Sequence, residues 1–250
     1  MINKKKNHKN TNGRRILLLS VLCLFGFYLV AQVQPRRNAA QPAKSKVYLL
    51  HSDVLKKNKD NPNAQILVGD VSFRHDSIYM YCDSACFYEK TNSLEAFHNV
   101  KFVQGDTLFL YGDYLFYDGN TQLAQVRNNV RMENRTTTLT TDSLNYDRIA
   151  NLGYFFDGGT LMDEQNVLTS DWGEYSPATK MSVFNYEVKL VNPQFTLTSD
   201  TLRYNTDTKI ASIVGPSDID SDENHIYSEL GFYYTQQGQA ELLERSVLTN

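Results

Sequence analysis

Residues 111–132 read YGDYLFYDGNTQLAQVRNNVRM, and residues 139–147 read LTTDSLNYD. Each stretch carries an acid, Asp113 in the first and Asp142 in the second, that follows a small residue and precedes a tyrosine by four positions. An aliphatic residue also stands three positions before each acid. Two segments that share this pattern at a separation of 29 residues indicate a chain built from internal repeats.

The pattern recurs along the chain in seven registered copies. Its acids are Asp53, Asp83, Asp113, Asp142, Asp171, Asp200 and Glu229, at spacings of 30, 30, 29, 29, 29 and 29 residues. Six copies have an aromatic ring four positions after the acid: Phe87, Tyr117, Tyr146, Tyr175, Tyr204 and Tyr233. Lys57 takes that position in the first copy, which predicts an atypical terminal unit.

The second half of each unit has apolar columns of its own. The residues 13, 17 and 19 positions after the acid are mostly apolar, and their offsets share parity, so a strand presents them on one face. The position between them, 15 after the acid, predicts a bulge or bend because it is mostly polar or glycine: His98, Asn128, Asp157, Tyr186 and Gly215. We therefore expect an all-β fold, an elongated twisted β-jelly-roll or solenoid of about seven two-strand repeats of 29–30 residues, with about fourteen strands.

Charge is distributed unevenly along the sequence. Residues 1–37 contain eight basic residues and no acid, which leaves 17 basic and 28 acidic residues in the remainder, a net charge of −11. Phosphate backbones are bound by basic faces, so an acidic body argues against nucleic acid as a partner.

The basic N-terminus precedes an apolar run at residues 16–31, ILLLSVLCLFGFYLVA. A positive segment before such a run targets a chain to a membrane with its positive end inside. We expect residues 1–33 to be a signal peptide or a membrane anchor, residues 34–46 to be a linker, and residues 47–250 to form the repeat domain. Both alternatives place the domain outside the cytoplasm.

A metal or catalytic site at the acid column would need carboxylate oxygens that converge within a few ångströms. Equivalent acids on alternate strands of one sheet lie roughly 10 Å apart, which is too far to share an ion. The simpler interpretation is a hydrogen bond from the acid to the backbone that fixes a bulge or turn. No nucleophile, phosphate-binding or metal-ligand motif is present, so we expect no catalytic residue, no metal site, no cofactor and no enzymatic activity.

The registered copies, carried best by residues 111–132 and 139–147, resemble the OstA-like family of lipopolysaccharide-transport proteins, which includes LptA, LptC and the periplasmic part of LptD. The resemblance covers Val47 to Asn250. The two segments that carry it best are similar to the OstA-like proteins of Bacteroidetes-type bacteria. The resemblance implies a periplasmic β-jelly-roll that holds lipopolysaccharide acyl chains and helps to bring lipopolysaccharide to the outer membrane for its assembly.

The resemblance also implies a set of lipid-lining residues and partners. The lining residues are expected on the inward columns of the central units: Leu110, Leu115, Tyr117, Val126, Val130, Met132, Leu139, Leu144, Tyr146, Phe155 and Leu161. The same residues suit a closed core. The expected partners are lipopolysaccharide, other OstA-like transport components or a second copy joined end to end by strand pairing, and the membrane through an uncleaved N-terminal segment.

Two alternatives stay open at this point. One is a structural or adhesive extracellular β-solenoid with a fully packed interior and no lipid ligand. The other is a repeat-built enzyme, which would need acids clustered around a cleft. The chain ends just after the last apolar column, so the final strand is expected to be an open edge for a partner, or the start of a longer protein.

Overall fold

The computed structural model describes residues 45–59, 61–221 and 224–249, and within these ranges it is built of strands and turns without a helix. The all-β prediction is confirmed. The N-terminal strands are β1 (Tyr48–His51), β2 (Val54–Lys57), β3 (Gln65–His75), β4 (Ile78–Tyr88), β5 (Ser93–Gln104), β6 (Leu108–Asp118), β7 (Leu123–Asn134), β8 (Thr137–Asp147), β9 (Leu152–Phe155) and β10 (Gly159–Asp163). The C-terminal strands are β11 (Asn166–Ser170), β12 (Trp172–Tyr175), β13 (Met181–Asn192), β14 (Phe195–Asn205), β15 (Ile210–Ile213), β16 (Ser217–Ser221), β17 (His225–Ser228), β18 (Leu230–Tyr234), β19 (Gln239–Glu244) and β20 (Val247–Thr249).

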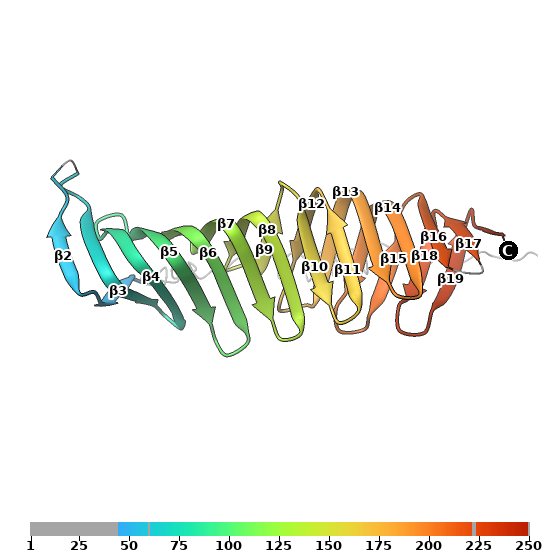
Figure 1. Cartoon of the computed structure of the whole chain (residues 1–250), viewed down its shortest axis with the longest axis horizontal. Helices are drawn as coiled ribbons and strands as arrows, with labels where there is room; N and C mark the ends of the chain where they lie inside the picture. The colour runs from blue at the N-terminus through green and yellow to red at the C-terminus, as the bar shows by residue number, and fades with distance from the viewer. Residues whose placement is uncertain (1–44, 60, 222–223, 250) are drawn as a thin grey trace, which may run out of the picture. The chain divides into compact units, whose positions relative to one another are not determined.

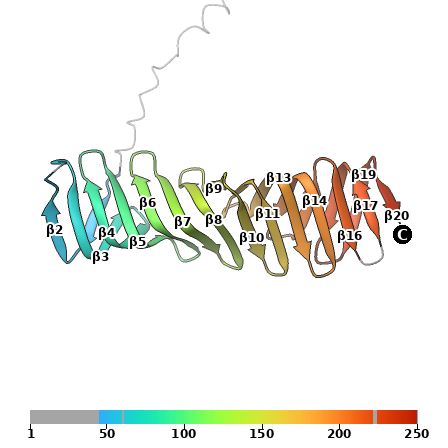
Figure 2. The same ribbon diagram turned by 45° about the horizontal axis from the view of Figure 1, so that its top comes forward.

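The strands form one antiparallel ladder whose repeats succeed one another along its length (Figure 1). Each repeat folds back on itself, so the ladder consists of two half-sheets that face each other. In the third repeat, residues 114–127 lie in half-sheet A and residues 130–141 in half-sheet B. We keep these two names for the equivalent residues of the other repeats. Figure 2 shows the two layers of strands from a second direction.

A bend joins half-sheet A to half-sheet B in every repeat. In β7 the register shifts between Arg127 and Val130, and the two residues between them, Asn128 and Asn129, have φ values of 62° and 52°. Such left-handed conformations are tolerated best by glycine and asparagine, and they turn the strand sharply. His98 in β5 and Tyr186 in β13 begin equivalent pairs. The bulge predicted 15 positions after the acid is therefore confirmed at these positions.

The described residues form twenty strands where the sequence predicted about fourteen. Each repeat still contributes two antiparallel passes. In several repeats, however, the chain leaves the ladder at the bend, so one long strand becomes two short ones. β9 and β10, for instance, are separated by residues 156–158, where Gly158 has a φ of 80°.

A single apolar core runs between the half-sheets. The aromatic column contributes Tyr117, Tyr146, Tyr175 and Tyr204, each no more than 1% exposed. Rings from the two half-sheets touch: Phe102 of half-sheet B lies 6.1 Å from Tyr117 and 6.0 Å from Tyr146, measured between ring centroids. Burial of each such side chain contributes about 1.5–3 kcal/mol to folding, so the repeated columns hold the half-sheets together.

The core is uncovered at both ends of the ladder. β1 and β2 form one end, and β19 and β20 form the other. Leu55 and Leu248 belong to inward columns, yet they are 55% and 58% exposed because no further strand covers them. Lys57, which replaces the aromatic residue of the first repeat, lies on the exposed edge strand β2.

The predicted signal peptide or anchor at residues 1–33, and most of the linker at residues 34–46, lie outside the described residues. Within the part of the chain that the structure does describe, no helix is long and apolar enough to cross a bilayer.

Candidate functional site

The eleven residues predicted to line a lipid site lie together in the core. They come from β6 to β10, and each is no more than 2% exposed: Leu110, Leu115, Tyr117, Val126, Val130, Met132, Leu139, Leu144, Tyr146, Phe155 and Leu161. The structure thus brings them into one continuous apolar interior. Their side chains fill it, and they do not surround an open groove.

The interior is closed along one long side by the bend, where the chain itself joins the half-sheets. The acids of the repeat pattern lie on the outer surface of this bend. Asp83 and Asp113 are exposed, and they accept hydrogen bonds from the amides of Asn99 at 2.8 Å and Asn129 at 2.6 Å. Each asparagine is the second residue of a bulge, so the acids do fix the bend. The predicted hydrogen bond between the acid and the backbone is wrong at these two positions, because the donor is the side chain of an asparagine.

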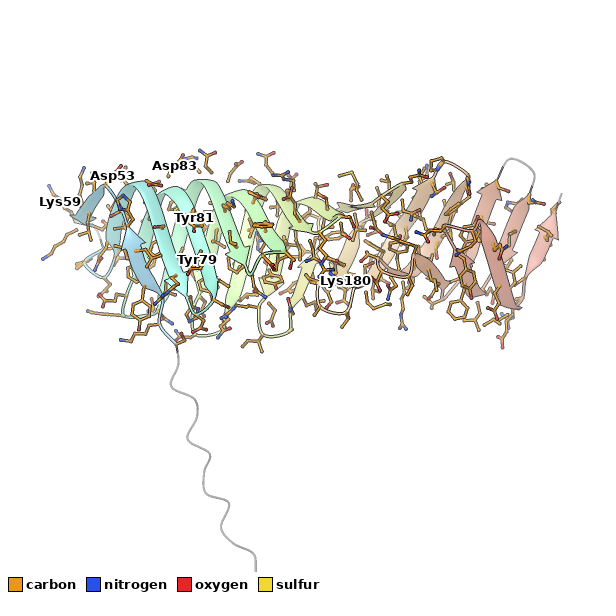
Figure 3. All side chains as sticks on the ribbon, turned by 90° about the horizontal axis from the view of Figure 1, so that it is seen from below. Asp53, Lys59, Tyr79, Tyr81, Asp83 and Lys180 are labelled. Atoms are coloured by element: carbon orange, nitrogen blue, oxygen red, sulfur yellow. The ribbon has the colours of Figure 1, made fainter. Side chains whose placement is uncertain are left out.

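The opposite long side is closed by a row of hydrogen bonds that we call the polar seam. Tyrosines of half-sheet A reach polar residues that end the strands of half-sheet B: Tyr117 to His75 at 2.7 Å, Tyr175 to Asn134 at 3.1 Å, and Tyr204 to Asp163 at 2.8 Å. Each pair joins residues 41 or 42 positions apart. Figure 3 shows Asp53 and Asp83 along one long edge and Lys180, a seam residue, away from it.

A second column of residues reaches the seam from the hairpin turns of half-sheet A. These residues stand nine positions after the second to seventh acids and are all left-handed, with φ between 55° and 63°: Asn92, Gln122, Asn151, Lys180, Lys209 and Gly238. Four of their carbonyls, those of Asn92, Gln122, Lys180 and Lys209, accept backbone hydrogen bonds from the next repeat, as Lys180 O does from Thr206 N at 2.9 Å. The backbone slot is therefore constant, and only the side chain changes from repeat to repeat.

The seam contains a buried ion pair in its C-terminal half. Lys209 Nζ lies 2.7 Å from both carboxylate oxygens of Asp163 and 3.2 Å from Glu164 Oε1. Asp163 is fully buried and Lys209 is 6% exposed. Burial, together with the hydrogen bond to Asp163, raises the pKa of Tyr204, so this hydroxyl stays protonated and donates a hydrogen bond to the carboxylate.

Towards the N-terminal end, the seam contains a histidine. The pKa of His75 is lowered by burial, partly offset by the nearby Asp76 carboxylate, so the ring is held neutral beside Tyr117. Arg148 bridges Asp76 and Gln122 at 3.0 Å and 2.7 Å. Sequence reasoning missed the whole seam. Its signal was the run of polar residues directly after the last inward column, which is easily taken for ordinary turn residues.

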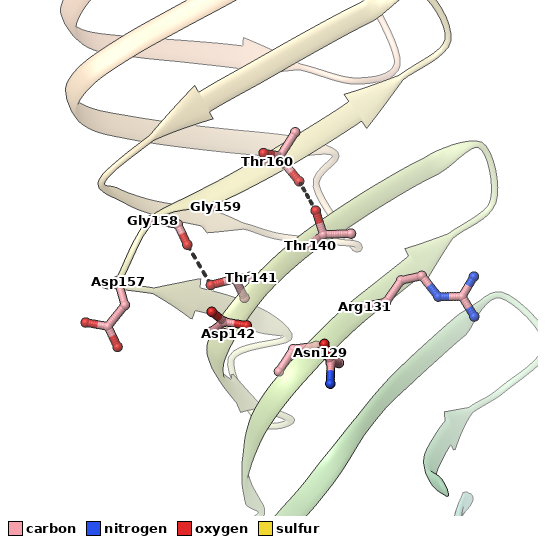
Figure 4. Close-up of a pocket in the computed structure, with 10 residues that line it drawn as sticks. Asn129, Arg131, Thr140, Thr141, Asp142, Asp157, Gly158, Gly159 and Thr160 are labelled. Atoms are coloured by element: carbon pink, nitrogen blue, oxygen red, sulfur yellow. Dashed lines mark hydrogen bonds between the residues drawn. The ribbon is translucent and has the colours of Figure 1, made fainter.

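The outer surface also has a polar cavity of about 560 Å³ where β8 parts into pairings with β9 and β10 (Figure 4). Thr141 Oγ1 donates to Gly158 O at 2.7 Å across the parting of the strands. Asp142 and Asp157 lie on its lining. Among the described residues, no group of three or more His, Cys, Asp or Glu side chains is placed to hold a metal ion.

These features define a class of protein: a tandem β-repeat with two facing half-sheets, one continuous apolar interior and two open ends. Residues 44–200 match the family model of the OstA-like proteins, and the chain belongs to that family. The family match gives no bacterial group, so the similarity to proteins of Bacteroidetes-type bacteria stays a prediction.

Among solved structures, the chain is similar to LptH of Pseudomonas aeruginosa, described as the LptA-homologous periplasmic component of the lipopolysaccharide transport device. The two chains share 12% identity over 69% of this chain and 94% of LptH, with a TM-score of 0.25. A comparison with curated proteins found no match.

Proposed function

We propose that this protein is a non-enzymatic carrier that binds the acyl chains of lipopolysaccharide in its interior and passes the lipid across the periplasm towards the outer membrane. One observation carries the proposal: the apolar interior runs without interruption through the repeats and is uncovered at both ends. An amphiphile needs a dry path for its tails, and a repeat fold extends such a path by adding units. The family membership supports the same function.

Entry of a lipid requires the two half-sheets to part. The bend is a covalent hinge, while the seam is held by noncovalent contacts: hydrogen bonds that each contribute about 1 kcal/mol, and the ion pair between Lys209 and Asp163. The seam is therefore the side that opens, with the bend kept intact. Acyl chains would then replace contacts among the inward side chains, and the polar head would stay at the seam in contact with water.

The open ends are suited to strand pairing with another OstA-like component or a second copy. Along half-sheet A, the strands from β2 to β19 are even in number, and each is antiparallel to its neighbour. When two copies are related by translation, β19 of one copy is therefore antiparallel to β2 of the next. Edge strands with unpaired backbone groups favour this kind of addition. The apolar N-terminal segment would deliver the chain to the periplasm or tether it to the inner membrane.

Photo-crosslinking in cells tests the carrier proposal with the full chain. A benzophenone amino acid replaces Tyr117, which is fully buried, or Tyr81, which is 40% exposed on the outer face of β4. We expect a lipopolysaccharide adduct after irradiation at Tyr117 and none at Tyr81. An adduct at neither site, in protein shown to be folded by protease resistance, would contradict the proposal.

The second candidate is a structural or adhesive β-solenoid without a lipid ligand. It is favoured by the burial of all eleven predicted lining residues, which leaves no preformed groove among them. The same experiment separates the two functions, since a closed structural core yields no lipid adduct at Tyr117.

A further inference from the structure

Two neighbouring repeats fill the same seam positions with residues of opposite charge. Lys209 faces Asp163 and Glu164. Lys180, which stands one repeat of 29 residues earlier, faces Asn134 and Arg135. The backbone is the same at both places: Glu164 and Arg135 have φ values of 56° and 57°. The site at Lys209 therefore combines one cation with two carboxylates, whereas the site at Lys180 has two cations, Lys180 and Arg135.

The positive site surrounds a cavity. Arg135, Lys180 and Asn134 line a space of about 290 Å³ at the seam, together with Leu108 and Pro177. Lys180 Nζ donates to the neutral Asn134 Oδ1 at 2.5 Å, and Tyr175 donates to the same oxygen. No carboxylate among the described residues lines this cavity or forms a salt bridge with Lys180 or Arg135.

The electrostatics of the site favour an anion. Burial, followed by repulsion from Arg135, lowers the pKa of Lys180, while the carboxylate of Asp207 opposes that change more weakly. A dianionic group between the two cations would relieve their repulsion and form charge-assisted hydrogen bonds to both. A phosphate monoester carries about 1.5–2 negative charges at neutral pH and has three acceptor oxygens.

We propose that Lys180 and Arg135 form a binding site for a phosphate monoester at the polar seam. The lining of the cavity is mostly polar, but it includes Leu108, which is part of the same core as the predicted lipid-lining residues. This continuity with the core suits a phosphate that belongs to an amphiphile. The phosphate of a glycolipid head would sit at the seam while its acyl chains lie inside. The lipid part of this inference rests on the proposed function, whereas binding of phosphate itself does not.

The first test measures binding of radiolabelled inorganic phosphate to the full chain in detergent by equilibrium dialysis. Lys180→Gln removes one cation, and the double variant Asn134→Asp/Arg135→Glu copies the residues of the next repeat. We expect each to weaken binding by about tenfold or more. The matched control Lys189→Gln removes an exposed cation from the outer face of β13 and should bind as the original protein does.

The inference is overturned if the original protein retains no more phosphate than the ionic background accounts for. Equal binding by the original protein and the double variant would overturn it too. The double variant is built from side chains that the fold already accepts one repeat away, and its thermal unfolding is measured alongside. A variant that has lost its folding transition is replaced by Lys180→Gln for the comparison.

The second test separates a lipid headgroup from free phosphate. Lipopolysaccharide, untreated or dephosphorylated enzymatically, is crosslinked to the benzophenone at position 117 with and without Lys180→Gln. We expect the substitution to reduce the adduct yield with the untreated, phosphorylated lipid and to leave the yield with the dephosphorylated lipid unchanged. An equal yield in all four combinations assigns the site to free phosphate and overturns the lipid part. Absence of any adduct contradicts the carrier proposal and leaves the phosphate measurement to stand by itself.

Discussion

The position nine residues after the acid, in the second to seventh repeats, shows how a single backbone conformation accepts different side chains. The position requires a left-handed backbone conformation, which a lysine residue adopts at some cost in energy. At Lys209 the surrounding ion pair and hydrogen bonds compensate that cost. The side chain that is stable at each seam position thus depends on the residue that faces it across the seam, which belongs to the repeat two units earlier in the chain.

The ion pair gives a first prediction at this scale. Asp163→Asn leaves Lys209 buried with Glu164 as its one remaining carboxylate partner, and we expect the free energy of unfolding to fall by about 3 kcal/mol. Urea unfolding followed by circular dichroism measures the change. Asp207→Asn, at an exposed turn position, is the control and should cost less than about 0.5 kcal/mol. Equal losses for the two variants would show that the pair is unimportant.

The buried histidine gives a second prediction, on pH. Because the pKa of His75 is lowered in the folded protein, the unfolded chain binds the proton first, below an ordinary pKa of about 6.5. Stability should therefore be complete above that pH and decrease as the pH falls from about 6.5 towards 5. His75→Gln, which copies Gln104 of the next repeat, should flatten the profile in this window. Identical profiles for both proteins would rule out this role.

At the scale of elements, the bend decides the architecture. A straight strand of this length would give one wide sheet with an exposed apolar face. Two consecutive left-handed residues fold it into two half-sheets that cover each other. The bend also carries the acid–asparagine pairs, so the most regular feature of the sequence has a structural role.

The third prediction tests the bend. Asn129→Val places a β-branched residue at a φ of 52°, and we expect it to cost about 1–3 kcal/mol of unfolding free energy. Asn129→Gly keeps the conformation and loses the hydrogen bond to Asp113, which should cost about 1 kcal/mol or less. Thermal unfolding of the two variants measures the difference. The interpretation fails if valine is tolerated as well as glycine.

Much of this level was predictable from the sequence. Registered spacing gave the repeat, parity gave the inward columns, and the polar residue at His98 and Asn128 gave the bulge. The seam was not predictable, since its pairs, such as Tyr117 with His75, join different repeats and become neighbours after the half-sheets face each other. The donor at Asp113 was missed for a related reason: Asn129 is 16 residues away and comes next to the acid through the bend alone.

At the scale of the repeat domain, charge differs between its two ends. The edge strand β2 carries Lys56 and Lys57, while the edge strand β19 carries Glu241 and Glu244. Opposite charges on the two edges favour a join between unlike ends over a join between like ends. Exposed inward residues at both ends would be covered by such a join.

The fourth prediction concerns association of the full chain in detergent. Glu241→Lys/Glu244→Lys brings like charges to a join of unlike ends, and we expect association to weaken by about tenfold in sedimentation velocity. Mixing this variant with Lys56→Glu/Lys57→Glu should restore association between the two. If the charge-reversed protein associates as strongly as the original, the ends are not the interface.

The complete filling of the interior has a consequence for unloading. An acyl chain inside the proposed carrier separates inward side chains that pack against each other when the cargo is gone. Their re-association is favourable, because an unfilled space would forfeit dispersion contacts. In the proposed carrier, closing of the interior would therefore offset part of the cost of releasing an acyl chain to the next component. Direction of flow in such a passive relay would come from the supply of lipid at one end.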